Sequence, residues 1–167
     1  MAFQGMTFVF NASPLIVLAK AGLLERVLEL PQCVLIPHSV ALEVSNCRDP
    51  HDPARLWLQR AETAAYLHDS PQVSDFVSAW GLGKGESSVI SLAETLPIAT
   101  PVLDDLAARR CAMALRLPVT GTLGLLLMAK KAGCLEKVAP ALDAVVDAGL
   151  FISDRHIQAI RDKAGES

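Results

Sequence analysis

Short β-prone apolar runs alternate with helix-like segments along most of the chain. Each predicted strand is followed by residues whose apolar positions recur with the period of a helix. Parallel strands need such a helical crossover between them, so the alternation predicts a mainly parallel central sheet covered on both faces. The fold class is therefore α/β, with three layers in the order α/β/α. The predicted strands are residues 7–10, 33–36, 64–67, 98–103 and 118–120.

Capping residues and glycines set the bounds of the predicted helices. Ser13 is placed to cap the first helix, with Pro14 at its first position. The glycine-rich stretch 81–85 forms a flexible lead into a later helix. The predicted helices are residues 14–20, 23–30, 40–44, 54–61, 86–96, 107–115, 122–132, 135–148 and 154–164.

The chain of 167 residues has the length of one compact domain, so we expect a single domain over residues 1–167. Apolar residues make up 51% of the sequence. No uninterrupted apolar run approaches the ~18 residues that a bilayer-spanning helix requires, so we expect no membrane association. The first residues lack the basic start and long apolar centre of a secretory signal, which favours the cytoplasm.

A formal net charge of −3 argues against a protein that holds nucleic acid by bulk electrostatics. Any such role must work locally, through a metal ion or a few basic side chains around it. The sequence has no GxGxxG, P-loop, CxxC, HExxH or GxSxG motif. Nucleotide fingerprints, zinc sites and the serine-hydrolase elbow therefore have no support.

Acidic and amide side chains occur where a parallel sheet gathers ligands. Asn11 ends the first predicted strand, and Asp104 and Asp105 end the fourth. Glu43 lies in the helix after the second strand, and Glu86 begins the helix after the glycine-rich lead. Ligands bind beyond the carboxyl ends of such strands, so we expect the four carboxylates to reach one end of the sheet. Mg²⁺ and Mn²⁺ prefer oxygen ligands, and such a cluster suits phosphodiester hydrolysis.

Each acid also has a purely structural interpretation. Glu86 at a helix start favours the positive end of the helix dipole. Asp104 or Asp105 can simply cap the next helix. On the residues alone, both interpretations stay open.

Several ordered motifs resemble a PIN-domain protein, specifically the DUF3368-type branch of prokaryotic PIN-like proteins. Together these motifs span about residues 7 to 155. They are Val9-Phe10-Asn11-Ala12-Ser13-Pro14-Leu15-Ile16, Ile36-Pro37 with Glu43-Val44, Leu82-Gly83-Lys84-Gly85-Glu86, Val102-Leu103-Asp104-Asp105-Leu106-Ala107-Ala108-Arg109 and Val119-Thr120-Gly121-Thr122-Leu123-Gly124.

The resemblance implies a metal-dependent endoribonuclease that uses Mg²⁺ or Mn²⁺ to cut single-stranded RNA, often as the toxin of a toxin–antitoxin pair. It implies metal ligands at Asn11, Glu43, Glu86 and Asp104 or Asp105, with the four acids as catalytic residues. An antitoxin protein and a second copy of the chain, in a homodimer, are the partners that it implies.

Four further side chains are candidates for substrate contact. Ser13 and Thr120 match small hydroxyl positions of the family that orient water or phosphate. Lys84 and Arg109 lie next to the predicted ligands and can meet phosphates.

The family pattern has Asp at the position of Asn11. An amide oxygen can approach a metal, but it carries no charge and cannot take a proton from water. We therefore expect a ribonuclease of weakened activity. Two alternatives stay open: a catalytically inactive PIN-like module that binds RNA or a protein partner, and a small-molecule phosphohydrolase.

Overall fold

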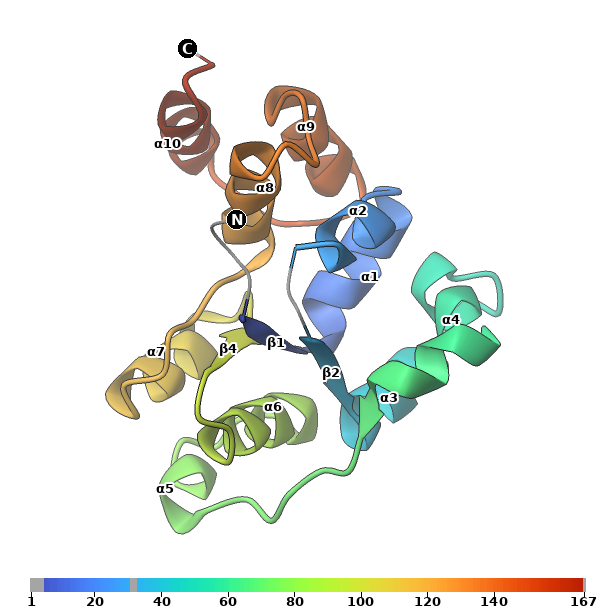
Figure 1. Ribbon diagram of the computed structural model, residues 1–167, viewed down its shortest axis with the longest axis vertical. Coiled ribbons are helices and arrows are strands. Elements are labelled where there is room, and N and C mark those ends of the chain that lie inside the picture. Colours follow the sequence, from blue (N-terminus) through green and yellow to red (C-terminus); the bar gives the residue numbers. More distant parts are fainter. Residues whose placement is uncertain (1–4, 31–32, 167) are drawn as a thin grey trace.

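The structure is a computed structural model, and it describes residues 5–30 and 33–166. In that part of the chain, four parallel strands form a central sheet in the order β3-β2-β1-β4 (Figure 1). The expected parallel α/β sheet is confirmed. The strands are β1 (Thr7–Phe10), β2 (Cys33–Pro37), β3 (Leu67–His68) and β4 (Ala99–Val102).

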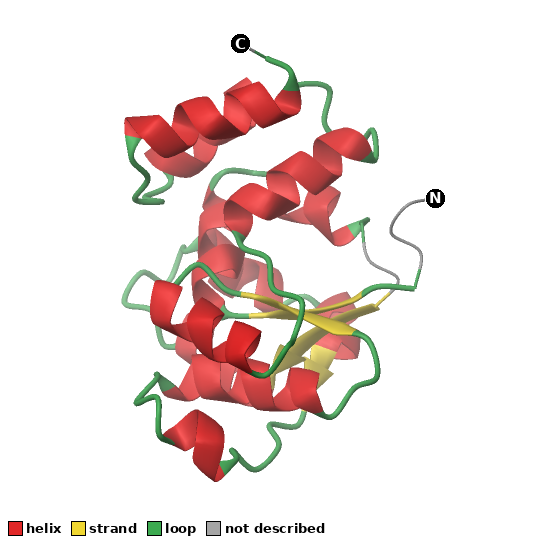
Figure 2. Ribbon diagram, turned by 90° about the vertical axis from the view of Figure 1, so that its left-hand side faces the viewer, coloured by secondary structure: helices red, strands yellow, loops and turns green. Residues whose placement is uncertain are grey.

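Helices cover the sheet on both sides. Figure 1 shows α1 and α2 on one side and α6 on the other, and the view turned by 90° shows the strands between helical layers (Figure 2). The helices are α1 (Ala12–Lys20), α2 (Leu24–Leu28), α3 (His38–Ser45), α4 (Pro53–Leu58), the 3₁₀-helix η1 (Ala61–Tyr66), α5 (Asp75–Ser78), α6 (Lys84–Glu94), α7 (Leu106–Ala114), α8 (Thr122–Lys131), α9 (Ala139–Asp147) and α10 (Asp154–Ala164).

The core lies on both faces of β1. Phe8, Val9 and Phe10 are each 0% exposed. Successive side chains of a strand point to opposite faces, so a strand with three consecutive buried residues must be covered on both faces. This burial confirms the predicted three layers.

The strand register brings two chain segments to the same edge of the sheet. Phe10 of β1 lies opposite Val102 of β4. The pairing extends one bond further, because the Asn11 N–H donates to the Val102 carbonyl oxygen at 3.2 Å. Asn11 therefore leaves the sheet next to Leu103 and Asp104.

Several predicted bounds differ from the structure. Residues 64–67 were expected as a strand, but most of them belong to η1, and β3 is limited to two residues that pair with Ile36 and Pro37. The strand expected at 118–120 is reduced to one bridge between Thr120 and Val102. The first helix starts at Ala12 rather than Pro14, so Ser13 lies inside it and does not cap it. Helix α5 was not predicted.

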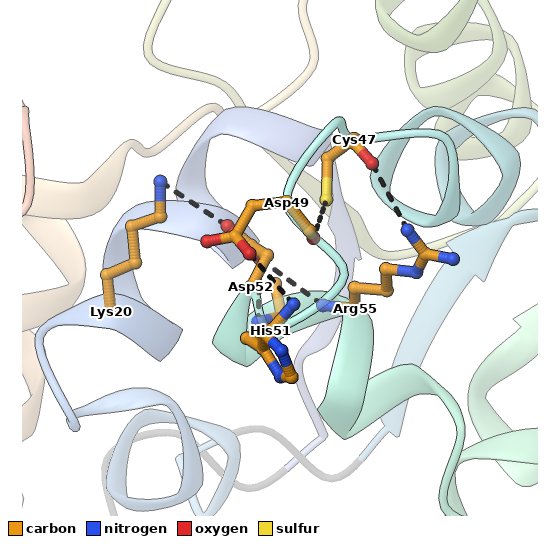
Figure 3. Close-up of polar contacts among 7 residues, drawn as sticks. Lys20, Cys47, Asp49, His51, Asp52 and Arg55 are labelled. Carbon is orange, nitrogen blue, oxygen red and sulfur yellow. Dashed lines mark hydrogen bonds and ion pairs between the residues drawn. The ribbon is translucent and has the colours of Figure 1, made fainter.

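A buried carboxylate organises the polar loop before α4 (Figure 3). Asp52 is 3% exposed. Its Oδ1 accepts hydrogen bonds from the N–H groups of Ala54 (2.9 Å) and Arg55 (3.3 Å), which caps α4. Its Oδ2 lies 3.3 Å from Lys20 Nζ at the end of α1. Asp52 thus ties the loop to both helices.

The C-terminal helix is held at its end by a second carboxylate. Glu166 accepts hydrogen bonds from the N–H groups of Val138 (2.7 Å) and Ala139 (2.8 Å), at the start of α9. Lys130, near the end of α8, donates both to Glu166 and to the Ala164 carbonyl oxygen. These contacts join one end each of α8, α9 and α10.

Across residues 5–30 and 33–166, no helix combines the length and the apolarity needed to cross a bilayer.

Candidate metal and nuclease site

The side chain of Asn11 is unusual for its place in the fold. It occupies the N-cap position of α1 with an extended backbone, yet its side chain makes no capping hydrogen bond. Asn is among the residues preferred there because its oxygen can accept from the first helical N–H groups. Here Asn11 is 6% exposed, and its Oδ1 has no hydrogen-bond partner among the described residues. A buried acceptor that the chain itself leaves unpaired is available to a ligand.

Glu43 approaches the same glycine as this amide. An ideal Cβ added to Gly85 would lie 2.7 Å from Glu43 Oε2 and 3.1 Å from Asn11 Oδ1. Any other residue at position 85 would therefore press on both oxygens. Gly85 is in the first turn of α6, so the two oxygens lie near the positive end of that helix.

Glu86, which follows this glycine, completes what we call the Asn11–Glu43 site (Asn11, Glu43, Gly85 and Glu86). Glu43 is exposed as a whole residue, but partial desolvation of its carboxyl, and secondarily the negative charge of Glu86, raise its pKa above the ordinary value. Glu86 Oε2 also accepts a hydrogen bond from the Gly83 N–H at 3.0 Å. Glu86 therefore both caps the start of α6 and acts on the charge of Glu43.

The two aspartates after β4 are engaged in different ways. Asp104 Oδ1 accepts from the Thr122 N–H at 2.7 Å, and Oδ2 accepts from Thr122 Oγ1 at 2.6 Å. Asp105 is exposed, and its Oδ1 accepts from the Ala108 N–H at 2.9 Å, which caps α7. The capping interpretation applies to Asp105, whereas Asp104 is tied to the start of α8.

Arg109 and Asp104 approach the same glycine, Gly121. An ideal Cβ on Gly121 would lie 2.8 Å from both Asp104 Oδ1 and Arg109 Nη1. The same guanidinium donates to the Leu103 carbonyl oxygen at 3.1 Å. We call Asp104, Arg109, Gly121 and Thr122 the Asp104 cluster; it combines an anion with a cation next to the end of β4.

The remaining predicted substrate contacts are placed less specifically. Thr120 is 5% exposed, and its hydroxyl faces α8, where a Cβ on Gly124 would lie 2.2 Å from Oγ1. Ser13 and Lys84 are exposed at the starts of α1 and α6. Their proximity to a phosphate stays a prediction.

The four predicted acids are thus not brought together: Glu43 and Glu86 belong to the Asn11–Glu43 site, Asp104 belongs to the Asp104 cluster, and Asp105 caps α7. No group of three or more His, Cys, Asp or Glu side chains that could hold a metal ion occurs in residues 5–30 and 33–166. Sequence reasoning missed Gly85, Gly121 and Thr122, which position the polar groups. The available signal was a glycine in the first turn of a helix. Glycine lowers helix stability relative to alanine, so its presence there suggests that another group approaches the backbone closely.

A family model described as DUF3368, PIN domain, matches residues 7–166. The chain belongs to this PIN-domain family. The PIN domain is a nuclease-like fold, and proteins of this kind generally use divalent metal ions. Comparison of this PIN domain with curated proteins and with solved structures gives no significant match.

Proposed function

We propose that this PIN domain is a Mg²⁺- or Mn²⁺-dependent endoribonuclease whose activity is weakened because Asn11 replaces the usual Asp. The observation that supports the proposal most is the unpartnered, buried Oδ1 of Asn11 beside Glu43 Oε2. An orphaned oxygen next to a carboxylate is the donor set that a hard divalent cation prefers.

Two oxygen donors of the site fit such an ion, which would keep its other positions for water and substrate. Asn11 Oδ1 and the Glu43 carboxylate would hold it directly, and Glu86 lies close enough to raise the pKa of Glu43. Asp104 is already hydrogen-bonded to Thr122, but a carboxylate has about four lone-pair sites and retains capacity to accept. A bound ion would polarise the phosphate and lower the pKa of the attacking water.

The chain's own residues then have distinct tasks. Glu43 must be ionised to serve as a ligand, because its protonated form has lost the charge that attracts a cation. Arg109, beside Asp104, is placed to bind a phosphate of the substrate, and Lys84 at the start of α6 is a second candidate. Asn11 supplies an oxygen without charge, which is the physical reason for weakened activity.

A catalytically inactive PIN-like module is the second candidate. It is favoured by the hydrogen bonds that already engage the carboxylates of Glu86, Asp104 and Asp105. Such a module would bind RNA or a protein without cleaving a bond.

The biological setting extends the same proposal. We infer single-stranded RNA as substrate and the cytoplasm as location. A toxin–antitoxin pair would add an antitoxin protein and a homodimer as partners. The family resemblance motivates each of these, and copurification from the native host would test the antitoxin.

An oligoribonucleotide cleavage assay tests the proposal. Wild type should cleave with Mn²⁺ and stop when EDTA is added, and Glu43→Gln should lose most of that activity. Glu62→Gln, an exposed glutamate on η1, is the matched control and should behave as wild type. No cleavage by wild type or by Asn11→Asp would favour the inactive module.

A further inference from the structure

A groove opens between α8 and α10, next to the Asp104 cluster. It has a volume of about 690 Å³, and Asp104, Arg109 and Thr120 lie at one side of it. Its other side is formed by α10 and the loop before that helix. In Figure 1, α8 and α10 lie beside each other at the end of the molecule away from α5.

The wall formed by α10 has one consistent face. His156, Ile160 and Lys163 all line the groove, and their spacing of four and then three residues places them on one side of a helix. The opposite wall includes Leu123 and Leu127 of α8. Apolar side chains thus occur on both walls, with Arg109 at one side of the groove and Lys163 at the other.

Phe151 is the feature of this groove that packing does not explain. It lies in the loop between α9 and α10, lines the groove, and is 98% exposed. Isolated exposed apolar residues are common, but this ring stands beside a groove that Arg109 and Lys163 also line, so it offers an aromatic face next to cationic side chains.

The charged residues that line the groove indicate what kind of ligand it binds. Arg109 and Lys163 line the groove with Asp104 as the one carboxylate among its lining residues, and His156 adds a further positive charge when protonated. This local excess of cations occurs in a chain whose formal net charge is −3. Cationic side chains along a groove with an exposed aromatic ring are typical of single-stranded nucleic-acid binding.

We propose that this groove binds the single-stranded RNA that flanks the cleaved bond, with a base stacked on Phe151 and phosphates at Lys163 and Arg109. The inference rests on the proposed function, because it takes RNA as the substrate of the adjacent site. A protein segment is a less suitable occupant. RNA carries a negative phosphate at every nucleotide to pair with Arg109 and Lys163, and a protein segment has no such regular series of charges.

Fluorescence anisotropy of the full chain with a labelled 12-nucleotide oligouridylate, in EDTA to prevent cleavage, tests this groove. Phe151→Ala should weaken binding by about 5- to 150-fold, the range found for loss of a stacked base, and Phe151→Trp should restore it. Lys163→Ala should reduce the slope of log affinity against log salt by about 0.7, the value for one phosphate contact to a single strand. Phe76→Ala and Lys131→Ala, exposed residues that do not line the groove, are the controls and should match wild type.

Affinities of Phe151→Ala and wild type within twofold of each other would overturn the groove proposal and leave a protein partner as its occupant. Absence of oligonucleotide binding by wild type would overturn it as well. Cleavage in Mn²⁺ is measured separately with the same variants. Phe151-dependent binding without any cleavage would contradict the nuclease while supporting the groove, and cleavage without Phe151-dependent binding would do the reverse.

Discussion

The side-chain oxygens of Asn11 and Glu43 approach the same point of α6, 3.1 Å and 2.7 Å from the position that a Cβ of Gly85 would occupy. Three segments far apart in the sequence therefore meet at one small space: the end of β1, α3 and the first turn of α6. The space is defined by a glycine, and it contains an unpaired amide oxygen. This relationship is the basis of the predictions on metal binding.

Filling the space should impair the site without unfolding the protein. In Gly85→Ala the added methyl group would meet Glu43 Oε2 and Asn11 Oδ1, which must move apart. The gain of roughly 0.5–1 kcal/mol in helix stability from Gly to Ala offsets part of that strain. We expect Mn²⁺ affinity, measured by calorimetry, to fall about tenfold or more, as when ligand geometry is disturbed.

Gly83→Ala is the comparison for this substitution. Its methyl group would approach nothing closer than Glu86 Oε2 at 3.3 Å, so its effect should be smaller. Equal Mn²⁺ affinity in wild type and Gly85→Ala would show that the space is not a metal site.

Glu43 should make the metal-free protein less stable as pH rises. Partial desolvation raises the pKa of its carboxyl in the folded state above the ordinary value of 4.5. Between the pKa of the unfolded state and that of the folded state, the folded protein therefore binds more protons than the unfolded chain. Stability falls with pH wherever the folded state holds the extra proton. Glu43→Gln removes this cost, and its stability relative to wild type, measured by urea unfolding in EDTA, should rise from pH 4.5 to pH 7.5. A difference that is constant with pH would contradict the assignment.

Glu166 should have the opposite dependence. The hydrogen bond from Lys130, with those from the Val138 and Ala139 N–H groups, lowers the pKa of Glu166 to about 2. Its contribution to stability is complete above the ordinary value of 4.5 and is lost as pH falls toward 2. Thermal unfolding between these values should show a smaller pH dependence for Glu166→Gln than for wild type. Glu136→Gln, at an exposed position, serves as the control. Equal slopes of melting temperature against pH in all three proteins would contradict a stabilising role for the Glu166 contacts.

Asp52 should be the most sensitive residue of the loop in Figure 3. Asp52→Ala removes the cap of α4 and the partner of Lys20, and leaves buried N–H groups unpaired. We expect a loss of about 1–3 kcal/mol in the free energy of unfolding, measured in urea. Asp49, which is exposed and accepts from the His51 N–H, is the control, and Asp49→Ala should change stability by about 0.5 kcal/mol or less. Equal losses in both variants would contradict the role of burial.

The fold was largely predictable because its signals are local. A β-prone run that ends at Asn11 and a buried run that ends at Pro37 carry their own strand bounds. The segment 64–67 failed because η1 precedes β3, which forms only by pairing with Ile36 and Pro37. A two-residue strand of this kind depends on a tertiary contact, which no local pattern reports.

The placement of Asn11 and Asp104 at one edge of the sheet was predictable, and the direction of their side chains was not. Parallel strands place Asn11 and Asp104 at one edge of the sheet by topology alone. The carboxylate of Asp104, however, is directed by Thr122, and Asn11 gains its environment from Gly85. Both relationships join residues of different elements, so they follow from packing rather than from spacing.

Calorimetric titration of Mn²⁺ into wild type and Asn11→Asp tests the central claim most directly, because position 11 supplies the neutral ligand of the proposed metal site. The added charge should strengthen binding by about tenfold or more, since ligand charge sets divalent-ion affinity. Asn11→Asp should also show a larger rise in thermal stability on adding Mn²⁺, because only the ion offsets the repulsion between Asp and Glu43. Mn²⁺ affinities that are the same in both proteins, or no binding in either, would contradict a metal site at Asn11 and Glu43.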